Sequence, residues 1–460
     1  MAEPQTKSRK PSAAQPAPVR AFTPRKLFPW LMGIWIAVTF AKFGNPVIFG
    51  NLIEAPHDGV ELVINSWPPS WGYFSLALVG FWAVTVWKSD RVAPKWILIL
   101  PLVWLGWQLI SARLTVNAHL TQQALLDFAG CALCFYLGIF ALSRSPTPAP
   151  IWAGLLAGLL FCLWTGLGQH FGGLEQMRQY VENIHWELYP PEMKAQLTSP
   201  EFQQKIASNR IFGTFVYPNA LAGGIILALP AALLGLWGFL QRVPFVVRGI
   251  LAGIVAWFGL ACLFWSGSKA GWLIMLGLGL LVLVHLKQLS SKLKLISVAI
   301  VLATGLGGFY ATHSAYFAKK NNSTAARLDY WRAAWELLKE KPIFGSGPGT
   351  FTVGYQRLKR PEAEPAKLAH NDYLQQGSDS GLVGLGSFLA LIGGSIFCLY
   401  RRIRPRAEPM LFAIWLGAAG LAAQEFVEFS LYIPALAWPF FLMLGWLWGV
   451  TGRPASPSTL

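Results

Sequence analysis

A histidine followed by an amide, His370-Asn371, stands in a long polar stretch of a chain that is otherwise strongly apolar. Three cations, Arg210, Lys269 and Arg327, occur elsewhere in the sequence, at positions that we expect on the same side of the molecule as the histidine. Histidine is suited to take up a proton near neutral pH, and guanidinium and ammonium groups stabilise phosphate oxygens. These residue types together predict a site for an anionic substrate with a base beside it.

The composition indicates what kind of scaffold holds these residues. Hydrophobic residues make up 54% of the 460 residues and charged residues only 13%. This is more apolar surface than one or two soluble cores would bury. We therefore expect an all-α, polytopic membrane protein, whose net charge of +16 requires no nucleic acid partner.

Apolar runs long enough to cross a hydrocarbon core of ~30 Å as helices recur along the chain. They predict twelve spans, at residues 27–43, 71–87, 96–110, 122–143, 151–169, 214–240, 246–265, 271–286, 295–312, 381–400, 409–423 and 432–450. Lys and Arg concentrate in alternate short loops, so both termini are expected in the cytoplasm.

The spans divide the chain into regions. We expect a disordered basic cytoplasmic tail (1–26), five helices (27–169), a periplasmic loop (170–213), helices six to nine (214–312), a large periplasmic loop (313–380), helices ten to twelve (381–450) and a cytoplasmic tail (451–460). No signal-peptide pattern follows the tail, which is expected to lie near anionic headgroups. The two long loops are the expected functional regions, because long loops cross the membrane regardless of charge.

The larger loop is predicted to begin with an amphipathic helix over 323–339, followed by a glycine-rich turn. Leu328, Trp331, Trp335 and Leu338 recur at helical spacing, which places them on one face. The turn at 344–350 is suited either to close backbone packing or to offering N–H groups to an anion. It lacks the Lys-Ser/Thr ending of a P-loop.

Several neighbours of the cations and the histidine are further candidates. Lys269 follows Ser268 in a tight turn between two apolar spans, where a cation needs an anionic partner. Asp372 is suited to orient His370 or to cap a helix. The remaining candidates are Asn219, which follows Arg210, Tyr373, which follows Asp372, and Glu425 with Glu428 at the end of the eleventh span.

The two glutamates have alternative interpretations. They are suited to contact a sugar or to pair with Arg327 or Lys269, and a capped, solvated helix end explains them equally well. No carboxylate and histidine cluster suggests a metal site or a cofactor. All five cysteines lie in apolar spans and indicate packing instead of disulfides.

The loop at 170–213 is rich in aromatic, Glu and Gln residues. Examples are Glu175, Tyr180, Glu182, His185, Trp186, Glu187 and Tyr189. Aromatic rings beside carboxylates and amides are typical of sugar contacts, although an interfacial aromatic belt gives the same pattern.

Five segments in this order resemble the O-antigen ligase and polymerase superfamily, specifically over about residues 205–400. They are Arg210-x-x-Gly-Thr-Phe with Pro218-Asn219, Ser266-x-Ser-Lys-Ala-Gly, Arg327-x-x-x-Trp331, Gly345-x-Gly-x-Gly-x-Phe351 and His370-Asn-x-Tyr-Leu followed by Gly381-x-x-Gly. The resemblance implies that Arg210 and Arg327 grip a diphosphate and that His370 serves the acceptor hydroxyl. Lys269 replaces the arginine that is usual in the family.

The resemblance also implies a function at the bacterial inner membrane. A glycan would move from a polyprenyl-diphosphate carrier to a periplasmic acceptor, the lipid A core in a ligase, without a metal and with inversion at the anomeric carbon. A polymerase of lipid-linked repeats and a protein O-glycosylating enzyme are alternatives. A small-anion transporter is the alternative outside enzymes, but it should carry charges near the bilayer midplane, where Asp127 is the main exception.

Overall fold

The computed structural model describes residues 24–88, 93–145, 147–183, 198, 203, 206–286, 289–317, 323–361, 363–404 and 407–452. Regular structure in these ranges is helical, and Gly44 and Phe215 form an isolated bridge. Residues 1–23 of the predicted N-terminal tail and 453–460 of the predicted C-terminal tail lie outside them, as do His185, Trp186, Glu187 and Tyr189. The all-α prediction is confirmed.

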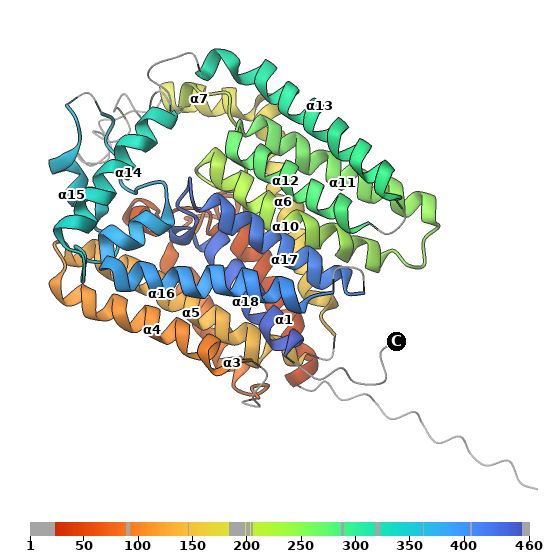
Figure 1. The fold of residues 1–460 in the computed structure, drawn as a ribbon, viewed down its shortest axis with the longest axis horizontal. Coiled ribbons are helices and arrows are strands. Elements are labelled where there is room, and N and C mark those ends of the chain that lie inside the picture. Colours follow the sequence, from red (N-terminus) through yellow and green to blue (C-terminus); the bar gives the residue numbers. More distant parts are fainter. Residues whose placement is uncertain are drawn as a thin grey trace, which may run out of the picture.

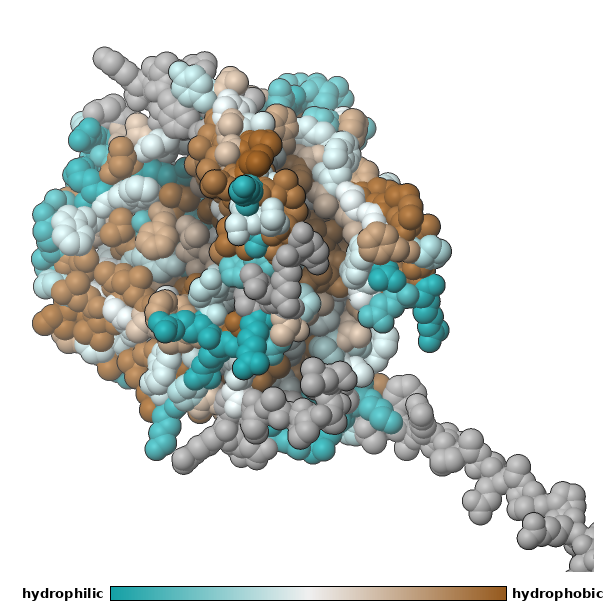
Figure 2. Space-filling model, turned by 45° about the vertical axis from the view of Figure 1, so that its right-hand side comes forward, coloured by the Kyte–Doolittle hydropathy of each residue, from teal (hydrophilic) through white to brown (hydrophobic). Residues whose placement is uncertain are grey.

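Each of the twelve predicted spans coincides with a helix. These are α1 (Pro24–Lys42), α3 (Pro69–Ala83), α4 (Lys95–Ser111), α5 (Ala118–Phe140), α6 (Ala149–Gly168), α10 (Pro218–Phe239), α11 (Phe245–Trp265), α12 (Lys269–His285), α13 (Ser291–Phe317), α16 (Asp372–Arg402), α17 (Pro409–Gln424) and α18 (Pro434–Thr451). Eight helical stretches in the described ranges are long and apolar enough to cross a membrane. The chain is a polytopic membrane protein, and broad hydrophobic areas are visible in Figure 2.

The helices differ in how deeply they are buried. α18 packs against α5 and α17, and 89% of its apolar stretch is buried. In contrast, 17% of the corresponding stretch of α11 and none of that of α13 is buried. Figure 1 shows α13 at the outer edge of the bundle, where it contacts α12. The protein therefore has a tightly packed core around α18 and, at one edge, a pair of helices, α12 and α13, that is little buried.

Asp127, the acidic residue inside a predicted span, is fully buried in α5. Its Oδ1 accepts a hydrogen bond from Trp438 Nε1 of α18 at 2.9 Å. An indole N–H is therefore the partner of this buried carboxyl group. A hydrogen-bond donor reduces the cost of burying a polar group.

α16 contains a break at Gly381, the residue at which the tenth span was predicted to begin. Gly381 has φ +71°, and a Cβ there would lie 2.0 Å from the carbonyl oxygen of Ile343. Only glycine combines this backbone with so close an approach. The stretch 372–380 is thereby held beside the large loop while the rest of α16 enters the bundle.

The large loop contains α14 (Ser323–Glu340) and α15 (Phe351–Leu358). The helix at 323–340 agrees with the prediction, but the predicted apolar face is wrong in part. Leu328 and Trp335 are more than half exposed, whereas Tyr330, Ala333 and Leu337 are buried. They pack on a core of the loop's own, with Phe351, Tyr355, Ala366 and Ala369, where small alanines permit a close approach.

The glycine-rich turn packs closely around a buried carboxyl group of the protein. Gly345, Gly347 and Gly349 all have positive φ. The N–H of Gly349 donates to Asp379 Oδ2 at 2.9 Å, and Asp379 is fully buried. The close-packing interpretation is therefore the one the structure supports, and the turn positions the start of α16.

Candidate functional site

Glu428 lies at the centre of a polar network just beyond α17. Its side chain is 7% exposed and pairs with the guanidinium of Arg327. Asn219 Nδ2 donates to Glu428 Oε1 at 2.6 Å. On the other side, Glu428 Oε2 lies 3.5 Å from His370 Nδ1. One buried carboxylate thus joins a loop helix, a membrane helix and the histidine.

The cations around Glu428 keep it ionised. Burial opposes the charged form, but the charge of Arg327, the contact with His370 and the charge of Arg210 together outweigh burial and hold the pKa of Glu428 below its usual value. An ionised Glu428 favours the tautomer of His370 that carries its proton on Nδ1. Nε2 is then the nitrogen available to accept a proton.

The backbone and neighbours of His370 fix the position of its ring. His370 has φ +50°, and no other non-glycine residue in the described ranges has positive φ. Its ring stacks on Tyr330 at 5.7 Å and meets the edge of Phe429 at 4.7 Å. Trp331 Nε1 donates to the His370 carbonyl oxygen at 3.2 Å. An uncommon conformation that several contacts maintain is typical of functional residues.

The residues after His370 start α16. Asn371 is the N-cap, since its side chain accepts from the N–H of Leu374. The N-cap interpretation of Asp372 is therefore wrong by one residue. Asp372 is fully buried and accepts from the N–H of Leu431 at 2.8 Å, while Tyr373 donates to the carbonyl oxygen of Ala422. Asp372 and Tyr373 anchor α16 to the segment that follows α17.

Glu425 lies close to this anchor. Its carbonyl oxygen accepts from the N–H of Asp372 at 2.9 Å, and its side chain is 1% exposed. The interpretation of Glu425 and Glu428 as a solvated helix end is wrong, because both are buried. The sequence suggested pairing with Arg327 as an alternative, and Glu428 makes that pair.

Arg210 connects the network to the turn between α11 and α12. Its Nη2 donates to Asn219 Oδ1 at 2.6 Å, and its Nε donates to the carbonyl oxygen of Ser266 at 2.7 Å. Gly267 in that turn has φ +62° and lies against the Arg210 side chain. Asn219, in the first turn of α10, therefore links Arg210 to Glu428.

Ser268 and Lys269 begin α12. The Ser268 side chain accepts from the N–H of Gly271 and caps the helix. Lys269 is the first helical residue and is half-buried. A cation at a helix N-terminus lies at the positive end of the helix dipole, which adds to the attraction for an anion. The turn that holds Lys269 is the one that Arg210 contacts.

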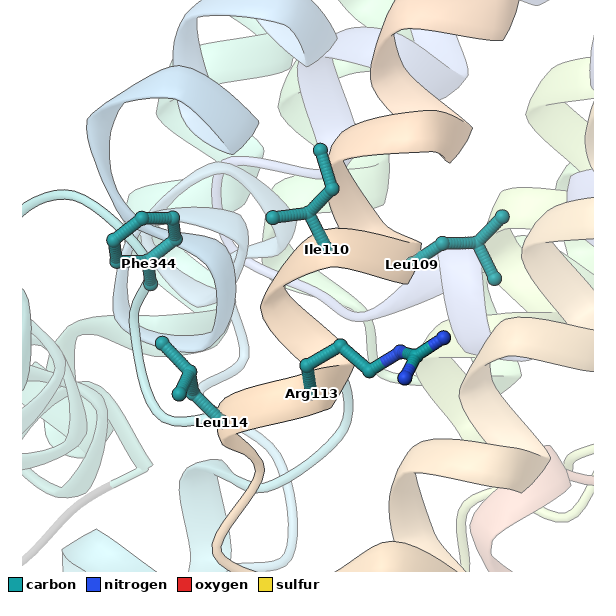
Figure 3. A pocket seen from close by; sticks show the side chains of 5 residues that line it. All are labelled: Leu109, Ile110, Arg113, Leu114 and Phe344. Carbon is teal, nitrogen blue, oxygen red and sulfur yellow. The ribbon is translucent and has the colours of Figure 1, made fainter.

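A groove of about 560 Å³ lies elsewhere, at the end of α4. Figure 3 shows Phe344 of the large loop facing Ile110 and Leu114, with the guanidinium of Arg113 directed away from Phe344. None of the predicted site residues lines this groove. The described ranges also contain no group of three or more His, Cys, Asp or Glu residues arranged to hold a metal ion.

The comparisons with known proteins agree with the resemblance. Residues 254–389 match the family model described as O-antigen ligase, a stretch that includes Lys269, Arg327 and His370. A protein of Haemophilus influenzae that is described as uncharacterized is 25% identical over 164 residues, which are 30% of this chain and 40% of that relative. The chain is a multi-pass membrane protein, and the family match over residues 254–389 supports membership in the O-antigen ligase superfamily.

Proposed function

We propose that this protein transfers a glycan from a polyprenyl-diphosphate carrier to an acceptor hydroxyl, with Arg210, Lys269 and Arg327 at the diphosphate. The observation that carries the proposal is the meeting of helix starts around one polar network. Asn219 lies in the first turn of α10, His370 lies just before α16, Arg327 lies one turn into α14, and Lys269 begins α12. Helix N-termini bind phosphate groups through their N–H groups and dipoles.

The chemistry follows from these charges. The acceptor oxygen attacks the anomeric carbon as the bond from that carbon to the diphosphate oxygen breaks, and the electron pair leaves with the diphosphate. The cations stabilise the negative charge that develops on the leaving group. His370 Nε2 accepts the proton of the hydroxyl and later releases it to water. Direct displacement inverts the anomeric configuration.

Glu428 has two roles in this scheme. It orients His370 through Nδ1 and stabilises the imidazolium after proton transfer, as a carboxylate does in other histidine-dependent enzymes. It also fixes Arg327 and, through Asn219, Arg210. The distance of 3.5 Å to His370 is long for a hydrogen bond, and such contacts often shorten when substrates bind.

The lipid A core is our first choice of acceptor, which makes the protein a ligase. A polymerase of lipid-linked repeats and a protein O-glycosylating enzyme use the same donor chemistry and are the alternatives. The site then faces the periplasm of the bacterial inner membrane, with both termini in the cytoplasm. No metal ion or cofactor takes part in the proposed reaction.

The test is release of polyprenyl diphosphate by purified protein given a lipid-linked glycan and a lipid A core acceptor. A product with one transferred glycan supports a ligase, and a ladder of longer lipid-linked chains supports a polymerase. Loss of release in His370→Ala and Arg210→Ala assigns the reaction to this site. A folded wild type that releases nothing with any of the three acceptor classes contradicts the proposal.

A further inference from the structure

Three aromatic side chains form a group next to the Arg210 network, here called the aromatic platform: the exposed His170 and Phe171 and the half-buried Trp265. The rings of His170 and Trp265 stack at 3.9 Å with an interplanar angle of 13°. Phe171 meets both edge-on, at 4.9 Å from His170 and 5.9 Å from Trp265. Phe171 is 76% exposed and His170 is also exposed, so the platform presents ring surface to its surroundings.

An irregular turn positions the rings of His170 and Phe171. After α6 the chain forms a π-helical turn, η4 (Gln169–Gly173), in which Phe171 and Gly172 leave helical geometry and Gly172 has φ +119°. Turns of this kind inside helices are frequent at functional sites. The Gln169 side chain accepts from the N–H groups of Phe212 and Gly213 and donates to the Gly213 carbonyl oxygen. The platform is thereby tied to the segment that carries Arg210.

Trp265 lies directly beside the anchors of Arg210. Its carbonyl oxygen accepts from the N–H of Ile211 at 3.2 Å, and the next residue, Ser266, accepts from Arg210 Nε. Lys269 follows four residues after Trp265 in the same turn. A ligand whose phosphates contact Arg210 and Lys269 therefore has the platform as its neighbour.

The position of the platform along the helix axes decides whether it contacts the sugar or the lipid chain of the donor. Trp164 on α6 is 74% exposed and precedes Phe171 by seven residues. It therefore lies roughly 10 Å from the platform along the axis of α6, in the direction of the start of that helix. The platform lies instead at the level of Lys269, at the end of α11. The lipid chain of the donor extends from the phosphates into the membrane, and the sugar extends away from it.

We propose that the aromatic platform is a donor subsite that stacks against the first sugar ring on the diphosphate. This rests on the proposed function for the identity of the donor. The C–H groups on one face of a pyranose carry partial positive charge and complement the negative face of an aromatic ring. Phe171 is the residue with the most ring surface to offer, and it acts in binding and not on the reacting atoms.

The test compares binding of two ligands to three proteins in lipid nanodiscs. The ligands are polyprenyl diphosphate and the same lipid bearing one sugar, and the proteins are wild type, Phe171→Ala and the matched control Trp164→Ala. We expect the wild type to bind the sugar-bearing lipid about threefold to tenfold more tightly than the sugar-free lipid. Phe171→Ala should abolish this preference, and Trp164→Ala should retain it.

Two outcomes contradict the subsite. An equal loss of affinity for both lipids in Phe171→Ala means that the ring contacts the lipid chain, and an undiminished preference means that it does not contact the sugar. Binding does not depend on transfer, so the two proposals separate. A sugar preference that Phe171→Ala abolishes, in a protein that transfers nothing to any acceptor, retains the subsite and removes the transferase.

Discussion

The His370 side and the Lys269 side of the site are built on different kinds of support. His370 and Glu428 lie against the ends of α16, α17 and α18, where rings, backbone N–H groups and carboxylates contact one another in a buried setting. Lys269 begins α12, which leads to α13, and none of the apolar stretch of α13 is buried. Arg210 contacts both sides through Asn219 and Ser266.

The difference indicates that the His370 side serves the chemical step and the Lys269 side serves donor binding. A base must hold its geometry within a few tenths of an ångström, and dense packing provides that. A lipid diphosphate that enters from the bilayer needs cations on a part of the protein that can adjust. We therefore expect variants on the His370 side to affect chemistry and stability, and variants on the Lys269 side to affect donor binding.

The largest effect is expected from removal of the base. His370→Ala should lower the transfer rate by about 10²- to 10⁴-fold with donor binding retained. His370→Asn is the matched control for the backbone, because asparagine tolerates positive φ better than most residues. Equal losses in both variants assign the effect to the imidazole, and transfer by His370→Asn near the wild-type rate would exclude His370 as the base.

Removal of Glu428 tests the support of the packed side. Glu428→Ala leaves Arg327 without its carboxylate and should lower the free energy of unfolding by about 3 kcal/mol. The double variant Arg327→Ala, Glu428→Ala should be more stable than Glu428→Ala, because no buried charge remains unpaired. Denaturant titration in detergent measures both, and a double variant less stable than the single one would mean that the ion pair is not the source of the effect.

On the adjustable side, Lys269→Ala should weaken binding of polyprenyl diphosphate about tenfold, equivalent to about 1.4 kcal/mol. Lys269→Arg should bind at least as well as the wild type, since a guanidinium contacts phosphate through two N–H groups. Binding titrations in nanodiscs give both values. Unchanged affinity in Lys269→Ala would place the diphosphate away from α12.

The smallest effect concerns pH. Because the pKa of Glu428 in the folded protein is below the ordinary glutamate value of about 4.5, its ionised form stabilises the fold fully above about that pH. This contribution is lost as the pH falls through the folded pKa. The stability difference between wild type and Glu428→Gln should therefore shrink below pH 4.5 in thermal unfolding experiments. A difference that grows on acidification would contradict the charge assigned to Glu428.

Much of the fold could be predicted, because a helix that crosses a membrane requires a long apolar segment, which can be recognised in the sequence. Each of the twelve predicted spans coincides with a helix, and the tenth was predicted to begin at Gly381, where α16 breaks. The buried face of α14 was not predictable from periodicity, since Ala333 and Ala334 are no more apolar in sequence than the exposed Leu328 and Trp335. Their burial depends on a partner surface, around Tyr355 and Phe351, that follows later in the chain.

The residue types of the site could be predicted, but the contacts between their side chains could not. His370 and the cations were apparent because charged groups are rare in this chain. Glu428 and Glu425 are three residues apart at the end of one helix, and composition does not reveal which of them meets Arg327. That depends on how the segment after α17 turns, which Asp372 fixes through the N–H of Leu431. The aromatic platform was missed because Trp265 is far in sequence from His170.

Glu428 also sets the net charge that a substrate meets. Arg210, Lys269 and Arg327 with the one carboxylate leave two positive charges, close to the roughly two negative charges of a diphosphate joined to both lipid and sugar. After transfer the freed diphosphate carries about one more negative charge, and the proton on His370 supplies the matching positive one. Under the proposed function, the site is therefore electroneutral before and after the reaction. When His370 loses that proton to water, one negative charge of the bound polyprenyl diphosphate is no longer compensated. Deprotonation of His370 therefore favours release of the polyprenyl diphosphate.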